Sequence, residues 1–323
     1  MLEKPALPDD AILTCLQTEF GVRADSLEFL PIGNDATAWA YRVRAASTDY
    51  FLKVKSGKLK EAALTVPRYL QDQGLCQVVA PLPSQSGLLH YPVESFSLIL
   101  YPYIAGQTGM QAGLNSALRQ ELGAVLQRIH NLTLPPTLAA QLPRERFTPP
   151  WIPVIARLEE SMAKNDLRNP EARQLAVFWQ EKQAEINAVI ARATETGKAL
   201  QAADLGFVLC HADFHDANLL IDPAGRLFIV DWDEVILAPK ERDLFFVTDT
   251  PGDSRLLQDG QARLFFEGYG PTEIDVLALS YYQYEWTVQE IGDFGERILL
   301  RDDLGEQTRQ SALKEFKIQF PFP

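Results

Sequence analysis

The sequence has few of the residues that cross-link a chain or anchor it in a membrane. Its three cysteines, Cys15, Cys76 and Cys210, are odd in number, and no two stand at metal-ligand spacing. We therefore expect neither a disulfide framework nor a structural zinc site. No apolar run approaches the roughly 20 residues that span a bilayer, and residues 1–5 show no basic segment followed by an apolar one. These absences predict a protein without a signal peptide, in the reducing cytoplasm.

Positive charge is scarce as well. Lys and Arg number 30 against 43 Asp and Glu, a formal net charge of −13. This balance argues against a nucleic-acid partner, which needs a basic surface, and against a polybasic membrane anchor. It favours a cationic small-molecule partner, although an acidic surface also serves solubility alone. The hydrophobic fraction of 46% is ordinary for a globular protein, and 323 residues suggest about two domains or lobes.

The first hundred residues are rich in strand patterns. Residues 39–44 and 50–55 are short β-rich runs separated by a polar stretch, which predicts a hairpin. Residues 97–100 form an apolar run typical of a buried strand, and the proline two residues later should end it, because proline cannot donate to a strand ladder. We therefore predict a β-rich N-lobe over residues 1–100 and a hinge over residues 101–106.

Beyond the hinge the spacing of apolar residues becomes helical. A first stripe of this kind comprises Leu118, Leu122, Val125, Leu126 and Ile129. Further helical windows lie at about 151–164, 171–196, 254–268, 274–300 and 303–320. An island of strand character interrupts them near residues 207–233. The pattern predicts an α+β architecture in which a small β-rich N-lobe precedes a larger, mostly helical C-lobe over residues 107–323.

The strand island contains a turn signal flanked by two apolar runs. The tetrapeptide Asp-Pro-Ala-Gly that begins at Asp222 favours a type I turn and hence a hairpin. If the turn closes between Asp222 and Gly225, Asn218 lies opposite Ile229, and Asn218 and Asp231 project from the same face. A carboxylate and an amide oxygen there can hold Mg²⁺, which prefers oxygen ligands. A bulge in the hairpin would break this parity.

Asp213 lies five residues before Asn218, in the segment that leads into the hairpin. An Asp, four residues, an Asn and then a hairpin that ends in Asp is the catalytic-loop arrangement of kinases. Phosphoryl transfer needs one carboxylate that orients the acceptor hydroxyl and takes its proton late, with other oxygen ligands holding metal on the phosphates. Each residue alone could simply cap a turn. The joint pattern of His211, Asp213, Asn218 and Asp231 predicts a catalytic loop with Asp213 as the base.

The segment that contains Asp213, Asn218 and Asp231 resembles that of a known family. The sequence HADFHDAN at residues 211–218, followed by IVDWD at residues 229–233, resembles the aminoglycoside phosphotransferase and choline kinase superfamily. The segments that look most like the spectinomycin phosphotransferases within it are residues 230–244, 266–270 and 280–282. The resemblance covers roughly residues 20–300. It implies a bilobal protein-kinase-like fold, MgATP as the phosphoryl donor and a small-molecule hydroxyl as the acceptor.

The resemblance also implies a phosphate-binding lysine and its partner. Lys53 stands at the family's lysine position, where its ammonium would meet the nucleotide phosphates. Lys55 shares the same strand face, so the choice of Lys53 rests on the resemblance. The family pairs this lysine with a helix glutamate, for which Glu61 is the best candidate. Pro67 interrupts the expected helix and makes that assignment awkward.

The adenine and acceptor sites complete the expected set. Backbone groups of Tyr101 and Tyr103 in the hinge would meet the adenine, while their side chains serve packing. A cationic acceptor needs carboxylates beside the base. Asp233, which follows the metal-binding Asp, and Glu285, in a late helix, are our candidates, although ordinary solvated acids would look the same in the sequence.

The resemblance thus predicts an ATP-dependent O-phosphotransferase with Asp213 as the base and Asn218 and Asp231 as magnesium ligands. The expected acceptor is an aminocyclitol or aminoglycoside antibiotic such as spectinomycin, because an added phosphate would spoil a drug's fit to ribosomal RNA and cause resistance. The alternatives are a metabolic kinase of the same superfamily, acting on choline, homoserine, methylthioribose or hydroxylysine, and a nucleotide-binding pseudoenzyme. The choice between ATP and GTP and the oligomeric state stay open.

Overall fold

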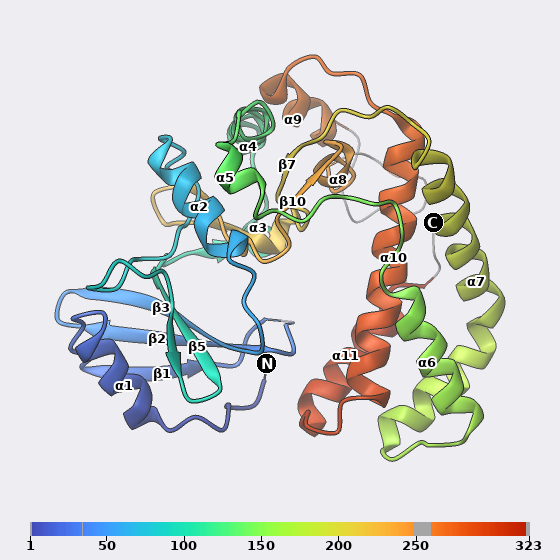
Figure 1. Cartoon of the computed structure of the whole chain (residues 1–323), viewed down its shortest axis with the longest axis horizontal. Coiled ribbons are helices and arrows are strands. Elements are labelled where there is room, and N and C mark those ends of the chain that lie inside the picture. Colours follow the sequence, from blue (N-terminus) through green and yellow to red (C-terminus); the bar gives the residue numbers. More distant parts are fainter. Residues whose placement is uncertain (1, 34, 248–259, 321–323) are drawn as a thin grey trace. The chain divides into compact units, whose positions relative to one another are not determined.

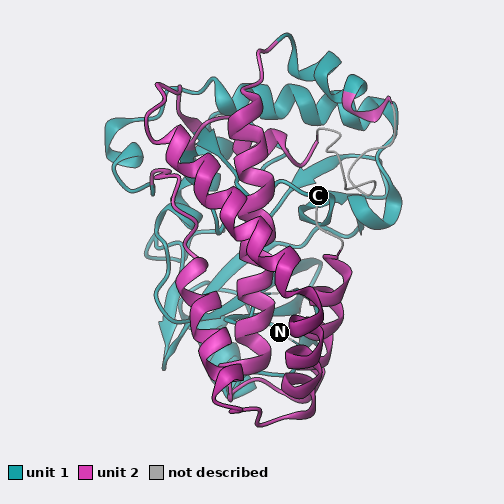
Figure 2. Ribbon diagram, turned by 90° about the vertical axis from the view of Figure 1, so that its right-hand side faces the viewer, with its two compact units in different colours: residues 1–143, 209–237, 263–271 teal, residues 144–208, 238–262, 272–323 magenta. Residues whose placement is uncertain are grey.

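A computed structural model describes residues 2–33, 35–247 and 260–320 of the chain. Its residues form two compact units (Figure 2). Unit 1 comprises residues 1–143, 209–237 and 263–271, and unit 2 comprises residues 144–208, 238–262 and 272–323. The chain passes between the units more than once, so neither unit is one continuous stretch of sequence. Most of the strand island groups with the N-terminal residues in unit 1. The division into an N-lobe, a hinge and a C-lobe stays a prediction.

Unit 1 is built around an antiparallel sheet with the strand order β1-β2-β3-β5-β4 (Figure 1). Its strands are β1 (Ser26–Leu30), β2 (Ala38–Ala45), β3 (Thr48–Ser56), β4 (Tyr91–Val93) and β5 (Phe96–Pro102). The predicted hairpin is confirmed as β2 and β3. The predicted buried strand is confirmed as β5, which ends at its proline.

Helices and shorter strands complete unit 1. The helices are α1 (Asp9–Thr18), α2 (Ala62–Asp72), α3 (Gly109–Ala112), α4 (Ser116–His130), α5 (Pro136–Ala139) and most of α9 (Gln261–Tyr269). The strand island forms β7 (Val208–Cys210), the 3₁₀ helix η1 (Asp216–Asn218), β8 (Leu219–Ile221) and β9 (Leu227–Ile229), and β10 (Ile236–Ala238) follows it. Of these residues, Val208 and Ala238 fall in unit 2. Strand β6 (Gln107–Thr108) extends the β8–β9 hairpin into a sheet, and β10 pairs with β7.

Three helical expectations meet different outcomes in unit 1. The apolar stripe of residues 118–129 is confirmed as α4. Helix α1 was not predicted, although its buried Ile12, Cys15 and Leu16 follow helical spacing. Helix α2 forms with Pro67 inside it, where the proline is buried. Part of the window predicted at 254–268, residues 254–259, lies outside the described residues, and α9 begins at Gln261.

The two faces of the large sheet differ, and this difference positions the candidate site. Tyr41, Leu52 and Leu100 lie side by side across β2, β3 and β5, and they are buried in one apolar cluster with α1. Because strand residues alternate between faces, Lys53 and Lys55 of β3 both lie on the opposite face. The apolar core therefore fixes one face of β3, and both lysines are presented on the other.

Unit 2 is helical. Its helices are α6 (Ile152–Ala163), α7 (Pro170–Leu200), α8 (Glu241–Leu244), α10 (Val276–Leu299) and α11 (Glu306–Ile318). Helix α10 packs against α6, α7 and α11, as Figure 1 shows. In the core, the ring of Trp179 stacks on Phe316 with centroids 5.7 Å apart. Gly292 and Gly295 of α10 bring that helix close to Trp151 and Leu158, since a Cβ at either glycine would lie within 2.7 Å of those side chains.

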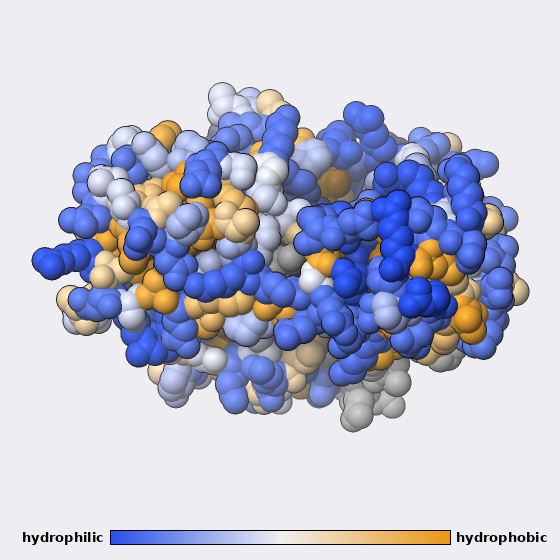
Figure 3. Space-filling view, turned by 90° about the horizontal axis from the view of Figure 1, so that it is seen from below, coloured by the Kyte–Doolittle hydropathy of each residue, from blue (hydrophilic) through white to orange (hydrophobic). Residues whose placement is uncertain are grey.

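The predicted α+β, protein-kinase-like fold class is confirmed, with a β-sheet N-terminal region and a helical C-terminal region. The cysteines Cys15, Cys76 and Cys210 form no disulfide with one another. Within the described ranges, no helix has the length and hydropathy needed to span a bilayer. On the face drawn in Figure 3, hydrophilic residues cover much of the surface, with small hydrophobic patches between them.

Candidate active site

The loop of the β8–β9 hairpin holds one residue more than predicted. The Gly225 N–H donates to the Asp222 carbonyl at 2.9 Å, as in the predicted turn. However, Gly225 has a φ of +78°, and the Asp222 N–H donates across the hairpin to the Arg226 carbonyl at 3.1 Å. A three-residue loop with a left-handed glycine results. It shifts the pairing, so that Leu219 and not Asn218 lies opposite Ile229. The predicted register is wrong by one residue.

Asn218 and Asp231 therefore do not share a face through strand alternation. Asn218 is the last residue of η1, and its carbonyl accepts the Val230 N–H at 3.0 Å. Asp231 lies beyond the end of β9 and has a left-handed φ of +61°, a conformation that Asp tolerates better than most residues. Asp216 begins η1. The backbone at the strand ends, rather than the strand pleat, directs these side chains.

Two side chains hold the carboxylate of Asp213. The Nε2 atom of His215 lies 3.2 Å from its Oδ1 atom, and Nδ2 of Asn218 donates to its Oδ2 atom at 2.7 Å. Burial by itself would raise the pKa of Asp213. The hydrogen bond and charge of His215, together with His211 and Asn218, outweigh burial and lower the pKa below its ordinary value. Asp213 is thus an ionised carboxylate in a fixed orientation. The sequence pattern gave His215 no role, and its position two residues after Asp213 was the one signal for it.

His211 connects the Asp213 segment to the strand that precedes Asp231. Its Nδ1 atom accepts the Asp213 N–H at 3.2 Å, and its Nε2 atom lies 3.0 Å from the Val230 carbonyl. Because Nδ1 accepts a hydrogen bond and Nε2 faces a carbonyl oxygen, the proton of the neutral imidazole is on Nε2. The ring is buried and lies 4.6 Å from Trp232, centroid to centroid. His211 therefore braces the backbone on both sides of the site.

Lys53 makes two ion pairs with the segment that follows β9. Its Nζ atom lies 3.0 Å from Asp231 Oδ1 and 2.9 Å from Asp233 Oδ2. Burial disfavours the ammonium, but the two carboxylates outweigh burial and raise the pKa of Lys53 well above its ordinary value. The structure thus brings together the predicted phosphate-binding lysine and a predicted magnesium ligand, which lie far apart in the sequence.

Glu61 lies elsewhere. It is the N-cap residue of α2, its side chain is 64% exposed, and it faces His90 across 3.8 Å. Asp233 holds the place beside Lys53 that the resemblance gave to Glu61. Asp233 was predicted to face the acceptor, and it contacts Lys53 and Lys55 instead. The geometry therefore favours Asp233 as the partner of Lys53. The predicted role of Glu61 at the nucleotide stays a prediction, and so does the predicted role of Asp233 at the acceptor.

The two hinge tyrosines differ in their surroundings. Tyr101 of β5 lies opposite Phe51, on the face that carries Lys53, and burial raises the pKa of its hydroxyl. The ring of Tyr103 lies 4.4 Å below the guanidinium of Arg42, and the Tyr103 N–H donates to the Asp49 carbonyl at 3.3 Å. This N–H already has a partner within the protein. Contacts of the tyrosine backbone with adenine stay a prediction.

Glu285 is buried in unit 2. Its Oε2 atom accepts a hydrogen bond from Arg242 at 2.5 Å, and burial and this carboxylate act in opposite directions on Arg242, whose pKa is raised on balance. A buried carboxylate paired in this way has little surface left for an acceptor. Its assignment to the acceptor site stays a prediction, and the geometry favours a structural role.

The donor atoms of Asn218 and Asp231 suit a hard divalent cation. Because Nδ2 of Asn218 is bonded to Asp213, its Oδ1 atom is turned away from that carboxylate. The Asp231 side chain is 42% exposed, so its carboxylate is accessible. One amide oxygen and one carboxylate are ligands that Mg²⁺ accepts, with water and phosphate oxygens completing its shell.

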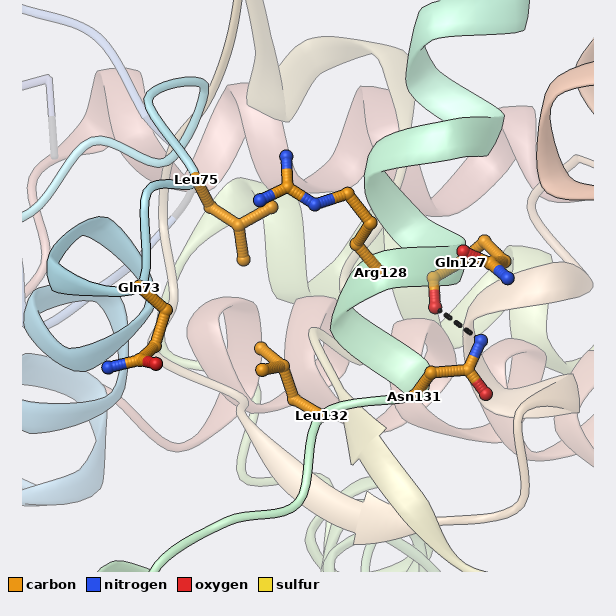
Figure 4. Close-up of a pocket in the computed structure, with 6 residues that line it drawn as sticks. All are labelled: Gln73, Leu75, Gln127, Arg128, Asn131 and Leu132. Carbon is orange, nitrogen blue, oxygen red and sulfur yellow. Dashed lines mark hydrogen bonds between the residues drawn. The ribbon is translucent and has the colours of Figure 1, made fainter.

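A separate cavity of about 420 Å³ lies in unit 1, between the end of α2 and the end of α4 (Figure 4). Its lining residues are Gln73, Leu75, Gln127, Arg128, Asn131 and Leu132. Arg128 reaches toward Leu75 and donates to the Gly74 carbonyl at 3.5 Å. None of the predicted site residues lines this cavity, so it is distinct from the candidate active site.

Comparison with known sequences identifies a family that matches most of the chain. The sequence profile of the phosphotransferase enzyme family matches residues 28–277. Protein StrN of Streptomyces griseus is 26% identical over 282 residues, which cover 84% of this chain and 79% of StrN.

Two solved structures place the chain further. A structure of spectinomycin phosphotransferase APH(9)-Ia in complex with ADP and spectinomycin is 30% identical, with a TM-score of 0.87 over 98% of this chain and 95% of that one. Choline kinase LicA from Streptococcus pneumoniae shares the fold, at 17% identity and a TM-score of 0.57 over 96% of this chain and 98% of that one. The chain therefore belongs to the phosphotransferase enzyme family and is a kinase that phosphorylates a hydroxyl group of a small molecule.

Proposed function

We propose that the protein transfers the γ-phosphoryl group of ATP to a hydroxyl of an aminocyclitol, with spectinomycin as the first candidate. The observation that carries this proposal is the likeness, over 98% of the chain and at a TM-score of 0.87, to an enzyme whose solved structure holds ADP and spectinomycin. We place the reaction in the cytoplasm, where ATP is abundant and cysteine thiols that form no disulfide stay reduced.

Asp213 is the proposed catalytic base. Its carboxylate is ionised and held by His215 and Asn218, so it can accept a hydrogen bond from the acceptor hydroxyl and align that oxygen with the γ-phosphorus. An alcohol is a weak acid, and the lowered pKa of Asp213 makes it a weak base. Asp213 therefore orients the hydroxyl first and receives its proton late, after the oxygen–phosphorus bond has begun to form.

The proposed ligands of the nucleotide phosphates and of the magnesium ion are Lys53, Asn218 and Asp231. Lys53 remains a cation and can exchange its carboxylate partners for nucleotide phosphate oxygens. Asn218 and Asp231 would hold Mg²⁺, which when bound neutralises charge on the phosphates. The loss of the Lys53 contact would leave the Asp231 carboxylate available for that role.

The test is an assay of ADP release. Purified protein with MgATP is mixed with spectinomycin, with aminoglycosides, and with choline, homoserine, methylthioribose and hydroxylysine in separate reactions. We expect ADP release and a phosphorylated product with spectinomycin. Turnover only with one of the metabolic alcohols would replace the proposed acceptor, and nucleotide binding without any product would favour a pseudoenzyme. Substituting GTP for ATP in the productive reaction identifies the donor.

A further inference from the structure

Lys55 occupies a position that the proposed mechanism does not use. It lies two residues after Lys53 on β3 and shares its face. Its Nζ atom contacts the Asp233 carboxylate and lies 3.0 Å from Asp35 Oδ2. The side chain is only 17% exposed. Burial of the Lys55 ammonium and of the two carboxylates costs solvation free energy, and only the ion pairs between them offset that cost.

The two lysines face three carboxylates. Lys53 is paired with Asp231 and Asp233, and Lys55 is paired with Asp233 and Asp35. Asp233 is therefore shared by both lysines. When Lys53 exchanges its carboxylates for nucleotide phosphates, Asp233 loses one of its two counter-ions. Lys55 is then the cation that remains beside it.

Lys55 also reaches the segment between β1 and β2. Asp35 uses its Oδ1 atom to accept the N–H and the hydroxyl of Thr37, each at 2.7 Å, and its Oδ2 atom faces Lys55. The Thr37 carbonyl in turn accepts the Ser56 N–H at 2.9 Å, beside Lys55 on β3. Residues 35–37 are thus tied to β3 through the Asp35 carboxylate and the Thr37 carbonyl.

We propose that Lys55 is a positioning residue for nucleotide binding. It neutralises Asp233 when Lys53 turns to the phosphates, and it holds Asp35 so that residues 35–37 keep their place beside β3. This role rests on the proposed function, since it presumes that Lys53 binds nucleotide phosphates. Without Lys55, the uncompensated Asp233 carboxylate both retains Lys53 and repels the anionic ligand.

The experiment compares nucleotide affinity among variants by calorimetric titration with MgADP, without any acceptor. Lys55→Met should weaken binding about tenfold or more, because a charge pair at this distance is worth at least that factor near a protein surface. Adding Asp233→Asn to Lys55→Met should restore affinity to within about threefold, since the carboxylate that needed a counter-ion is gone. Lys55→Arg, which keeps the charge, should bind like wild type.

The matched control is Lys60→Met. Lys60 is a neighbouring lysine that contacts the Asp233 carbonyl at 3.2 Å and the Glu234 carboxylate, but its side chain is 54% exposed. Its removal should leave the affinity unchanged, and circular dichroism checks the fold of every variant. Should Lys55→Met bind MgADP like wild type, or should Asp233→Asn fail to restore its affinity, the inference falls alone. Should wild type itself bind neither MgADP nor MgATP, the proposed function falls with it.

Discussion

At the scale of single residues, the Asp213 carboxylate is held by polar side chains that are close to it in sequence. Asp213 is held by His215 and Asn218, two and five residues further along the chain. Each contact alone is an ordinary loop hydrogen bond. Together they leave the carboxylate ionised and fixed in direction, which is what a group that aligns an incoming hydroxyl requires.

Replacing Asp213 by Asn tests this role. The amide keeps the size of the side chain but cannot accept a proton, so the turnover number should fall by about 10²- to 10⁴-fold. MgADP affinity should change less than about threefold, because the proposed nucleotide contacts come from Lys53 and Asp231. Steady-state assays and calorimetric titration measure the two quantities. Asp204→Asn, an exposed acid, serves as the control, and a near-normal rate in Asp213→Asn would remove Asp213 from its role.

At the scale of elements, close backbone approach is as important as side-chain packing. Helices α4 and α9 touch at Gly123 and Gly268. A Cβ at Gly123 would lie 2.1 Å from the Phe265 carbonyl oxygen, and one at Gly268 would lie 1.8 Å from the Gln120 carbonyl oxygen. Both neighbours are backbone atoms, which cannot turn aside as a flexible side chain can. The two glycines therefore set the separation of the helices.

Gly123→Ala should destabilise the protein. Alanine favours a helix by about 1 kcal/mol over glycine, but the overlap with the Phe265 carbonyl forces the helices apart at a cost of about 1–3 kcal/mol or more. The expected net result is a lower free energy of unfolding, measured by denaturant titration. Gly206→Ala is the control, since a Cβ at Gly206 meets nothing within 4 Å. A stabilised Gly123→Ala variant would show that the helices do not pack this closely.

At the scale of the whole molecule, the proposed nucleotide and catalytic residues all lie in unit 1. Lys53, Asp213, Asn218 and Asp231 come from the N-terminal residues and from the strand island, which the fold joins in one compact unit. Glu285 belongs to unit 2, where it pairs with Arg242. We therefore expect a bound nucleotide to stabilise unit 1 more than unit 2.

MgADP at about 100 times its dissociation constant should raise the free energy of unfolding by about 2.7 kcal/mol, because it binds only the native state. Thermal unfolding measures this gain, and hydrogen exchange should show the added protection in β3, β5 and the β8–β9 hairpin rather than in α7 of unit 2. Lys53→Met should lose most of the gain. Equal protection in both units would contradict a site built from unit 1.

The sequence alone determined the features that depend on local pattern. The β2–β3 hairpin, helix α4, the β8–β9 hairpin and the segment from His211 to Asn218 are all recognisable because their signals lie within a few residues of one another. Periodicity and turn chemistry act over this range. The family resemblance of the segment around Asp213 follows from the same short-range spacing.

The tertiary structure decided which distant residues meet. It placed Asp233, and not Glu61, beside Lys53, and it buried Glu285 against Arg242. It also shifted the β8–β9 register by one residue, because Gly225 adopts a left-handed conformation that the letters Asp-Pro-Ala-Gly permit but do not require. Long-range ion pairs depend on how the chain closes its loops, and a one-residue bulge is decided by small energies, so neither can be derived from local pattern.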